Sequence, residues 1–169
     1  RRLDVVEPGV QFLHRLTAGR TNAADRRRNA LVEADGVQVL LSVIQAASLL
    51  NAKSALAAKK RTDSSLPQNP DNERTEASAL ILRGILEVVA IVCSGNTKFS
   101  DDRRMKLIGA ISDEMCDLIS QNPDSLELQA ACFKILANYC ESNKRIVASA
   151  FVEDVIAAGA ITIATEVLF

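Results

Sequence analysis

Residues 76–87 have the sequence EASALILRGILE, and residues 127–138 have the sequence ELQAACFKILAN. In both stretches the apolar residues recur every three or four positions, which is the period of a helix with one broad buried face. The two stretches align at a shift of 51 residues, since residue 127 matches residue 76. They therefore predict two long and equivalent helices.

Three further stretches share a second pattern, in which a small residue or glycine precedes a β-branched residue and an amphipathic helix. The β-branched residues are Val37, Ile111 and Ile161. Shorter helices precede these stretches, and residues 28–32, 104–108 and 144–147 resemble one another there. We expect an all-α domain over residues 1–169, built from about three repeated units at about 9–50, 75–121 and 124–169.

The composition supports helices and excludes some functions. The chain has 169 residues, with 48% hydrophobic, 4% aromatic, 7 Gly and 4 Pro, too few turn residues for a sandwich of short strands. The formal charge of −1 argues against a general nucleic-acid binder, because phosphate affinity needs clustered cations. No apolar run is long and uncharged enough to span a membrane.

Residues 51–74 interrupt the pattern. Their first part extends the preceding helix to about Lys60, and the polar stretch from Arg61 to Asn72 is expected to be a flexible loop insertion. Helix 124–140 is expected to begin with Asp124 as its N-cap and Glu127 completing a capping box. Gly95 is expected to end the helix over 75–93 in a left-handed conformation.

These stretches resemble the armadillo family, with HEAT repeats as the alternative. Residues 28–44 are similar to the first two helices of an armadillo repeat, and residues 129–140 (QAACFKILANYC) to the long third helix. The resemblance covers about residues 24–169. It implies a right-handed α-solenoid, and the pattern at Phe169 suggests a piece of a longer array whose apolar end is covered by further repeats or by another chain.

The resemblance also implies a binding site, since third helices of armadillo proteins line a groove that holds extended peptides. The groove face would consist of five residues: Arg83, Glu87, Lys134, Asn138 and Glu141. Asn138 matches the family's asparagine, which grips a peptide backbone because an amide both donates and accepts. Lys134 stands where the family has tryptophan, which argues against basic localisation signals as ligands. The alternatives are a solvated helix face and an Asn138 that bonds neighbouring backbone.

No catalytic, metal or cofactor motif is present, so we expect no enzyme, no metal and no cofactor. His14 is expected on a helix surface. Asp101, Asp102, Asp113 and Glu114 are explained by their positions near helix starts. The four cysteines fall within apolar helical patterns, which predicts buried free thiols and a cytoplasmic or nuclear location: Cys93, Cys116, Cys132 and Cys140.

Two basic clusters, residues 26–28 and 59–61, suggest either contact with phosphate or an acidic partner, or solvated helix edges; Ser64 follows the second cluster as a weak phosphorylation candidate. We therefore expect a non-catalytic scaffold that binds an unidentified protein or peptide in its groove, without nucleic acid or membrane insertion. The alternative is a chaperone cofactor or assembly module that clasps a folded partner, including self-association through uncapped ends.

Overall fold

The computed structural model describes residues 3–59, 70–95, 97–142 and 144–168, and the side chains of 7–47, 79–95, 97–142 and 144–167. Over these ranges the chain forms nine α-helices and no strand, which confirms the all-α prediction. In chain order they are α1 (Leu3–Thr17), α2 (Asn22–Glu33), α3 (Gly36–Lys59), α4 (Pro70–Cys93), α5 (Lys98–Met105), α6 (Ala110–Gln121), α7 (Leu126–Cys140), α8 (Arg145–Ala157) and α9 (Ala160–Leu168).

The insertion between α3 and α4 is shorter than expected. Helix α3 runs to Lys59, which confirms the predicted extension. Helix α4 already begins at Pro70, a residue suited to the first helical position because its missing N–H would have no partner there. Residues 70–72 are therefore helical and not part of the loop. The rest of the predicted loop, with Ser64 and most of the basic cluster at 59–61, lies outside the described residues.

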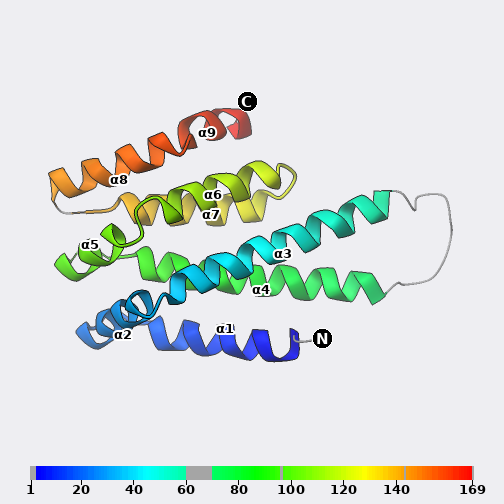
Figure 1. The fold of residues 1–169 in the computed structure, drawn as a ribbon, viewed down its shortest axis with the longest axis horizontal. Helices are drawn as coiled ribbons and strands as arrows, with labels where there is room; N and C mark the ends of the chain where they lie inside the picture. Colours follow the sequence, from blue (N-terminus) through cyan, green and yellow to red (C-terminus); the bar gives the residue numbers. More distant parts are fainter. Residues whose placement is uncertain (1–2, 60–69, 96, 143, 169) are drawn as a thin grey trace.

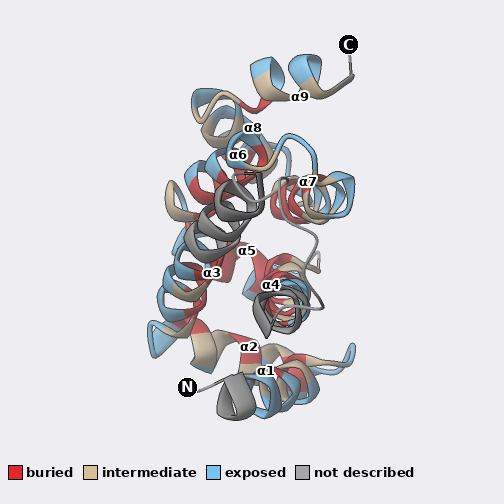
Figure 2. Cartoon of the chain, turned by 90° about the vertical axis from the view of Figure 1, so that its right-hand side faces the viewer, coloured by how far each residue is buried: buried red, intermediate tan, exposed pale blue. Residues whose placement is uncertain are grey.

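Helices three places apart in the chain pack side by side. Helix α4 lies between α1 and α7, α6 lies between α3 and α9, and α2 packs against α5. Figures 1 and 2 show α1, α4 and α7 on one side of the molecule and α3 and α6 on the other. Figure 2 shows the buried residues between these two groups of helices. Each long helix also contacts the helices next to it in the chain, so the core is continuous from α1 to α9.

Helix α4 is buried on most of its circumference, as its two apolar rows predict. The rows consist of eight buried residues: Ile81, Leu82, Ile85, Leu86, Val88, Val89, Val92 and Cys93. Its one glycine permits a close approach to α1, because a Cβ on Gly84 would lie 2.7 Å from Cγ1 of Val10.

Five helix junctions contain a residue with a positive φ angle. Gly19 after α1 and Gly95 after α4 have φ angles of 102° and 103°, so the predicted left-handed end at Gly95 is confirmed. The junctions before α3, α6 and α9 also have positive φ, at Asp35 (53°), Gly109 (79°) and Gly159 (85°). These positions favour glycine because it has no Cβ.

Two buried arginines, Arg28 of α2 and Arg104 of α5, make the same bonds at the same sequence distances. Each guanidinium donates to carbonyls eleven and nine residues earlier and to an aspartate three residues earlier: Thr17, Gly19 and Asp25 for Arg28, and Cys93, Gly95 and Asp101 for Arg104. The carbonyls lie at or just after the C-terminal ends of α1 and α4. The last carbonyls of a helix lack partners within the helix and carry partial negative charge.

The prediction of a solvated edge at residues 26–28 is therefore wrong for two of the three residues. Arg26 is exposed, but Arg28 is buried and Arg27 donates to the carbonyl of Leu16. Arg103 is buried in the same way. Burial, the largest effect, lowers its pKa to about 10, so it stays charged at neutral pH.

The third short helix differs from the other two. Lys144, which the sequence aligned with Arg28 and Arg104, is the exposed N-cap of α8 and lies in no equivalent position. The buried residue eleven positions after the end of α7 is Phe151, whose ring lies 5.4 Å from the guanidinium carbon of Arg104 and 5.0 Å from the ring of Tyr139. Phe151 is thus buried at the same sequence distance from the preceding helix end as Arg28 and Arg104 are.

Asp154 of α8 ties three helices together. Its carboxylate accepts hydrogen bonds from the backbone N–H of Gly109 (3.1 Å), the hydroxyl of Ser112 and the hydroxyl of Tyr139 (3.0 Å). Because Gly109 has no side chain to cap α6, a carboxylate from another helix supplies the cap.

The predicted cap of α7 is wrong. The N-cap is Ser125, one residue after Asp124, and Ser125 makes no side-chain capping bond. The buried Gln129 supports this corner instead, because its amide donates to the carbonyls of Asn122 (3.1 Å) and Pro123 (2.8 Å).

No single helix in the described part of the chain is both long and apolar enough to cross a membrane. Two pairs of consecutive helices reach that length and hydropathy only when the two helices of a pair are counted as one segment. The helices are bent relative to each other by 68° in the pair Asn22–Glu33 and Gly36–Ala47, and by 63° in the pair Arg145–Ala157 and Ala160–Val167.

Candidate functional site

A groove of about 1050 Å³ lies between the long helices α4 and α7. The turn between α6 and α7 lines one part of it, and His14 of α1 lines another. Its volume is at the upper end of the range of small-molecule pockets, and its walls are largely aliphatic. The aliphatic lining residues include Leu82, Leu86, Ala90, Leu128, Ala130 and Ala131.

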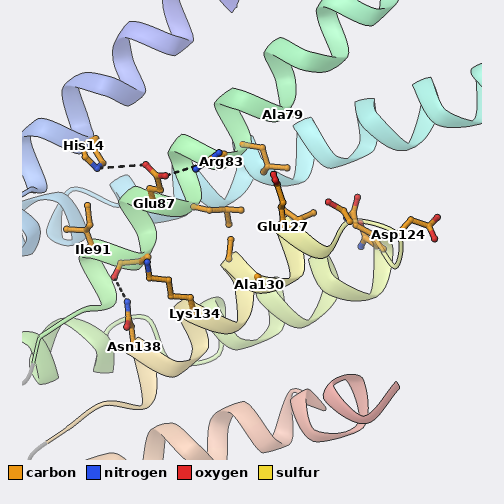
Figure 3. Close-up of a pocket in the computed structure, with 18 of the residues that line it drawn as sticks. His14, Ala79, Arg83, Glu87, Ile91, Asp124, Glu127, Ala130, Lys134 and Asn138 are labelled. Carbon is orange, nitrogen blue, oxygen red and sulfur yellow. Dashed lines mark hydrogen bonds and ion pairs between the residues drawn. The ribbon is translucent and has the colours of Figure 1, made fainter. Parts of the chain in front are cut away.

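Four of the five predicted groove residues line this groove (Figure 3): Arg83, Glu87, Lys134 and Asn138. The fifth, Glu141, does not line it. Glu141 is the exposed C-cap of α7, where the chain has left the helix with a φ of −71° and a ψ of 120°. The helical period that placed Glu141 on the groove face ends one residue earlier.

Asn138 joins the two walls of the groove. Its Nδ2 donates to the carbonyl of Ala90 on α4 at 3.1 Å, and its own carbonyl accepts a bond from Arg104 at 3.0 Å. The alternative that Asn138 bonds neighbouring backbone is therefore confirmed. Its second N–H and its side-chain oxygen have no hydrogen-bond partner within the described residues.

Glu87 is the centre of a small charge cluster on the α4 side. Its carboxylate lies 3.5 Å from Nε of Arg83 and 3.9 Å from Nε2 of His14. All three side chains are about half exposed or more, so the pairs contribute at most about 1 kcal/mol each to stability. His14 lies on the surface of α1, as predicted, with its Nε2 facing the Glu87 carboxylate.

The structure changes the correspondence between α4 and α7 by one helical turn. Buried residues of α4 match buried residues of α7 at a shift of 47 residues, not 51: Ile85, Val88, Val89 and Val92 match Cys132, Ile135, Leu136 and Tyr139. At this shift Lys134 corresponds to Glu87, and Asn138 corresponds to Ile91.

At a shift of 51, buried Leu86 would instead match exposed Ala137. The predicted match of Arg83 to Lys134 and Glu87 to Asn138 is therefore wrong, although all four residues line the groove.

The α6–α7 turn is the part of the groove that the sequence did not reveal. Asn122, Pro123, Asp124 and Ser125 of the turn line the groove, and so does Glu127 in the first turn of α7. The stretch from 122 to 127 was interpreted only as the start of a helix. No periodic pattern marks a turn as a groove wall, because its position depends on the angle between α6 and α7.

A second, smaller hollow of about 510 Å³ lies between α3 and α6 and is lined by acidic residues. Burial raises the pKa of Glu114, although the amide of Gln45 donates a hydrogen bond to its carboxylate. In the part of the chain that the structure describes, no three His, Cys, Asp or Glu residues are grouped to hold a metal ion.

The four cysteines are free, as predicted, and three are buried while Cys140 is half-buried. Burial raises the pKa of Cys93 and of Cys132 to about 12, so both are protonated and unreactive at neutral pH. Asp101 forms an ion pair with Arg104, and Asp113 lies in the first turn of α6, where a negative charge is favourable. Both carboxylates therefore have a structural role.

Comparisons with known proteins add no assignment to this geometry. No family model matches the chain, and no curated protein or solved structure is significantly similar to it.

Proposed function

We propose that the chain is a non-catalytic protein-interaction module whose groove between α4 and α7 binds an extended segment of a partner protein. The observation that carries this proposal is the groove itself, which is lined by aliphatic side chains together with charged and polar ones from both long helices. A leucine-sized side chain buried there would gain about 1.5–3 kcal/mol, enough for one anchor of a peptide.

We further propose that the helices form a right-handed α-solenoid of armadillo type. Three regularities support this architecture. Helices three places apart pack together, positive φ angles recur at equivalent junctions, and Arg28 and Arg104 make matching bonds. In such an array a groove along the long helices is a natural peptide-binding surface.

Asn138 has two roles in this proposal. One N–H fixes the distance between α4 and α7, and the remaining N–H and oxygen bind the main chain of the ligand. Lys134, one turn earlier, takes the place of an aromatic pocket and contributes charge instead. The partner would be recognised through a few anchors and not through a large apolar area. We expect such a module to act in the cytoplasm or nucleus without a cofactor.

A groove-filling substitution tests the proposal. Ala130 is exposed and lines the groove, so Ala130→Trp should obstruct it without disturbing the core. Ala30→Trp, at an exposed position of α2 outside the groove, is the matched control. The probe is a library of random twelve-residue peptides displayed on phage and selected against the full chain.

We expect the selected peptides to lose at least about tenfold in affinity for Ala130→Trp and to bind Ala30→Trp normally. The double variant Lys134→Ala with Asn138→Ala should also weaken binding. Peptides that bind Ala130→Trp as well as the original chain, or a library from which nothing is enriched, would show that the groove is not a peptide site.

A second candidate function is assembly with further copies of the chain. It is favoured by apolar side chains that are exposed on the last two described helices, Ile146, Ile156 and Ile161. Light scattering should then show a mass that grows with concentration, and Ile156→Glu should reduce it. A constant monomer mass for the original chain would rule this function out.

A further inference from the structure

The α7 wall carries opposite charges at its start and near its middle, and these charges lie outside the ion pairs of the described residues. Asp124 and Glu127 lie where α7 begins, and Lys134 lies two turns further on (Figure 3). Glu87, the acidic residue across the groove, already lies within ion-pair distance of Arg83 and His14. Lys134 and the two carboxylates therefore remain available to a ligand.

Helix termini do not change these signs. Helix α6 ends at Gln121 and α7 begins at Leu126, so the negative end of one helix lies close to the positive end of the next. Their partial charges oppose each other at this corner. The carboxylates of Asp124 and Glu127 consequently set the charge of this end of the groove.

Between these charges the groove has aliphatic residues, beside the Arg83–Glu87 pair of α4. Leu82 and Leu86 of α4 and Leu128 of α7 line it. An unpaired charge placed against these residues would lose hydration without gaining a partner. This part of the groove therefore suits an aliphatic side chain.

The spacing of the charges sets the spacing of the ligand. Glu127 and Lys134 are seven residues apart on one helix, which corresponds to about 10 Å along its axis. A peptide in the extended polyproline II conformation advances about 3.1 Å per residue with three residues per turn, so side chains three residues apart share one face and lie about 9 Å apart.

We propose that the groove selects a peptide segment with a basic and an acidic side chain about three residues apart and aliphatic residues between them. The basic side chain lies against Asp124 and Glu127, and the acidic side chain lies against Lys134. This inference rests on the proposed peptide-binding function and specifies its ligand. The rim charges act mainly by rejecting peptides of the wrong sign, because like charges repel while exposed pairs attract only weakly.

Charge reversal tests the proposal with the same peptide library. Lys134→Glu should change the preferred acidic residue of the selected peptides to a basic one. Glu127→Lys combined with Asp124→Lys should change the preferred basic residue to an acidic one. Lys144→Glu, at an exposed position of α8 outside the groove, is the control and should leave the selected sequences unchanged. Circular dichroism checks that each variant is folded.

The affinities of defined peptides give the second measurement. A peptide selected by the original chain should bind the Lys134→Glu variant at least about fivefold more weakly than it binds the original chain. Replacing the acidic residue of that peptide by Lys should restore its affinity for the Lys134→Glu variant. Selected peptides without a charge pattern, or with a pattern that Lys134→Glu leaves unchanged, would overturn the inference. If those peptides still lose affinity for Ala130→Trp, the groove remains a peptide site. If they do not, the proposed function fails as well.

Discussion

Single side chains hold the walls of the groove at a fixed distance. Arg104 is central among them, because it bonds the end of α4 and also the carbonyl of Asn138 on α7. It is fully buried, and so is most of its partner Asp101. A charged residue in such a place stabilises the fold only while all of its partners remain.

Arg104→Ala should lower the free energy of unfolding by about 3–5 kcal/mol, because it leaves Asp101 and several carbonyls buried without a partner. Arg26→Ala, at an exposed position, should change it by no more than about 0.5 kcal/mol. Urea unfolding followed by circular dichroism measures both. Equal effects of the two substitutions would contradict the structural role of Arg104.

Tyr139 offers a direct measurement of the cluster around Asp154. Burial, together with the hydrogen bond to Asp154, raises the pKa of Tyr139 above its usual value of 10.0. The neutral phenol therefore contributes stability that is present below pH 10 and is lost as the pH rises through the raised pKa. The chain has one Tyr and no Trp, so ultraviolet absorbance reports this group alone.

Asp154→Asn should lower the midpoint of this titration, because it removes the carboxylate charge, while the midpoint stays above 10 because the phenol remains buried. Ser112→Ala removes another bond to the same carboxylate but leaves its charge, so the midpoint should move less. A titration midpoint near 10 in the folded original chain would contradict the described geometry.

Between elements, α1 approaches α4 closely at Gly84. Gly84→Ala should lower the free energy of unfolding by about 1–3 kcal/mol, because the new methyl group overlaps the side chain of Val10. Val10→Ala removes the overlapping methyl group, so the double variant should be less destabilised than the sum of the two single variants. Thermal or urea unfolding of all four proteins completes this cycle. Additive effects would show that the two residues do not touch.

The helices and their apolar faces were predictable from the sequence, but the register between α4 and α7 was not. An apolar helix resembles itself after one turn, so shifts of 47 and 51 residues give similar patterns of leucines. Burial separates them, because Leu86 is buried and Ala137 is exposed. Helix periodicity identifies a face, whereas packing against the neighbouring helices decides which turn matches which.

Two other errors have a related origin. Arg28 follows the pattern of a charged surface residue, but the carbonyls at the end of α1 stabilise it inside the molecule. The wall formed by Asp124 and Glu127 depends on how a turn is oriented, which local sequence does not encode. Four of the five groove residues predicted on the helices were found, whereas the turn and the start of α7 were not predicted as groove walls.

At the level of the whole molecule, the four thiols report how easily each part opens. Because burial raises the pKa of Cys93 and Cys132 to about 12, both should react with iodoacetamide only through opening of the fold. Half-buried Cys140 should react first. Mass spectrometry at increasing reaction times gives the order. Labelling of Cys93 before Cys140 in the folded protein would contradict the packing around α4.

The pattern of helix contacts has a mechanical consequence. The main contacts join helices at most three places apart in the chain, and none of them joins the first helix to the last. We therefore expect helices far apart in the chain to change their relative tilt without breaking a direct contact. A partner that contacts both α4 and α7 would restrict the relative motion of these two helices. We therefore expect occupation of the groove to change the distribution of distances between α1 and α9.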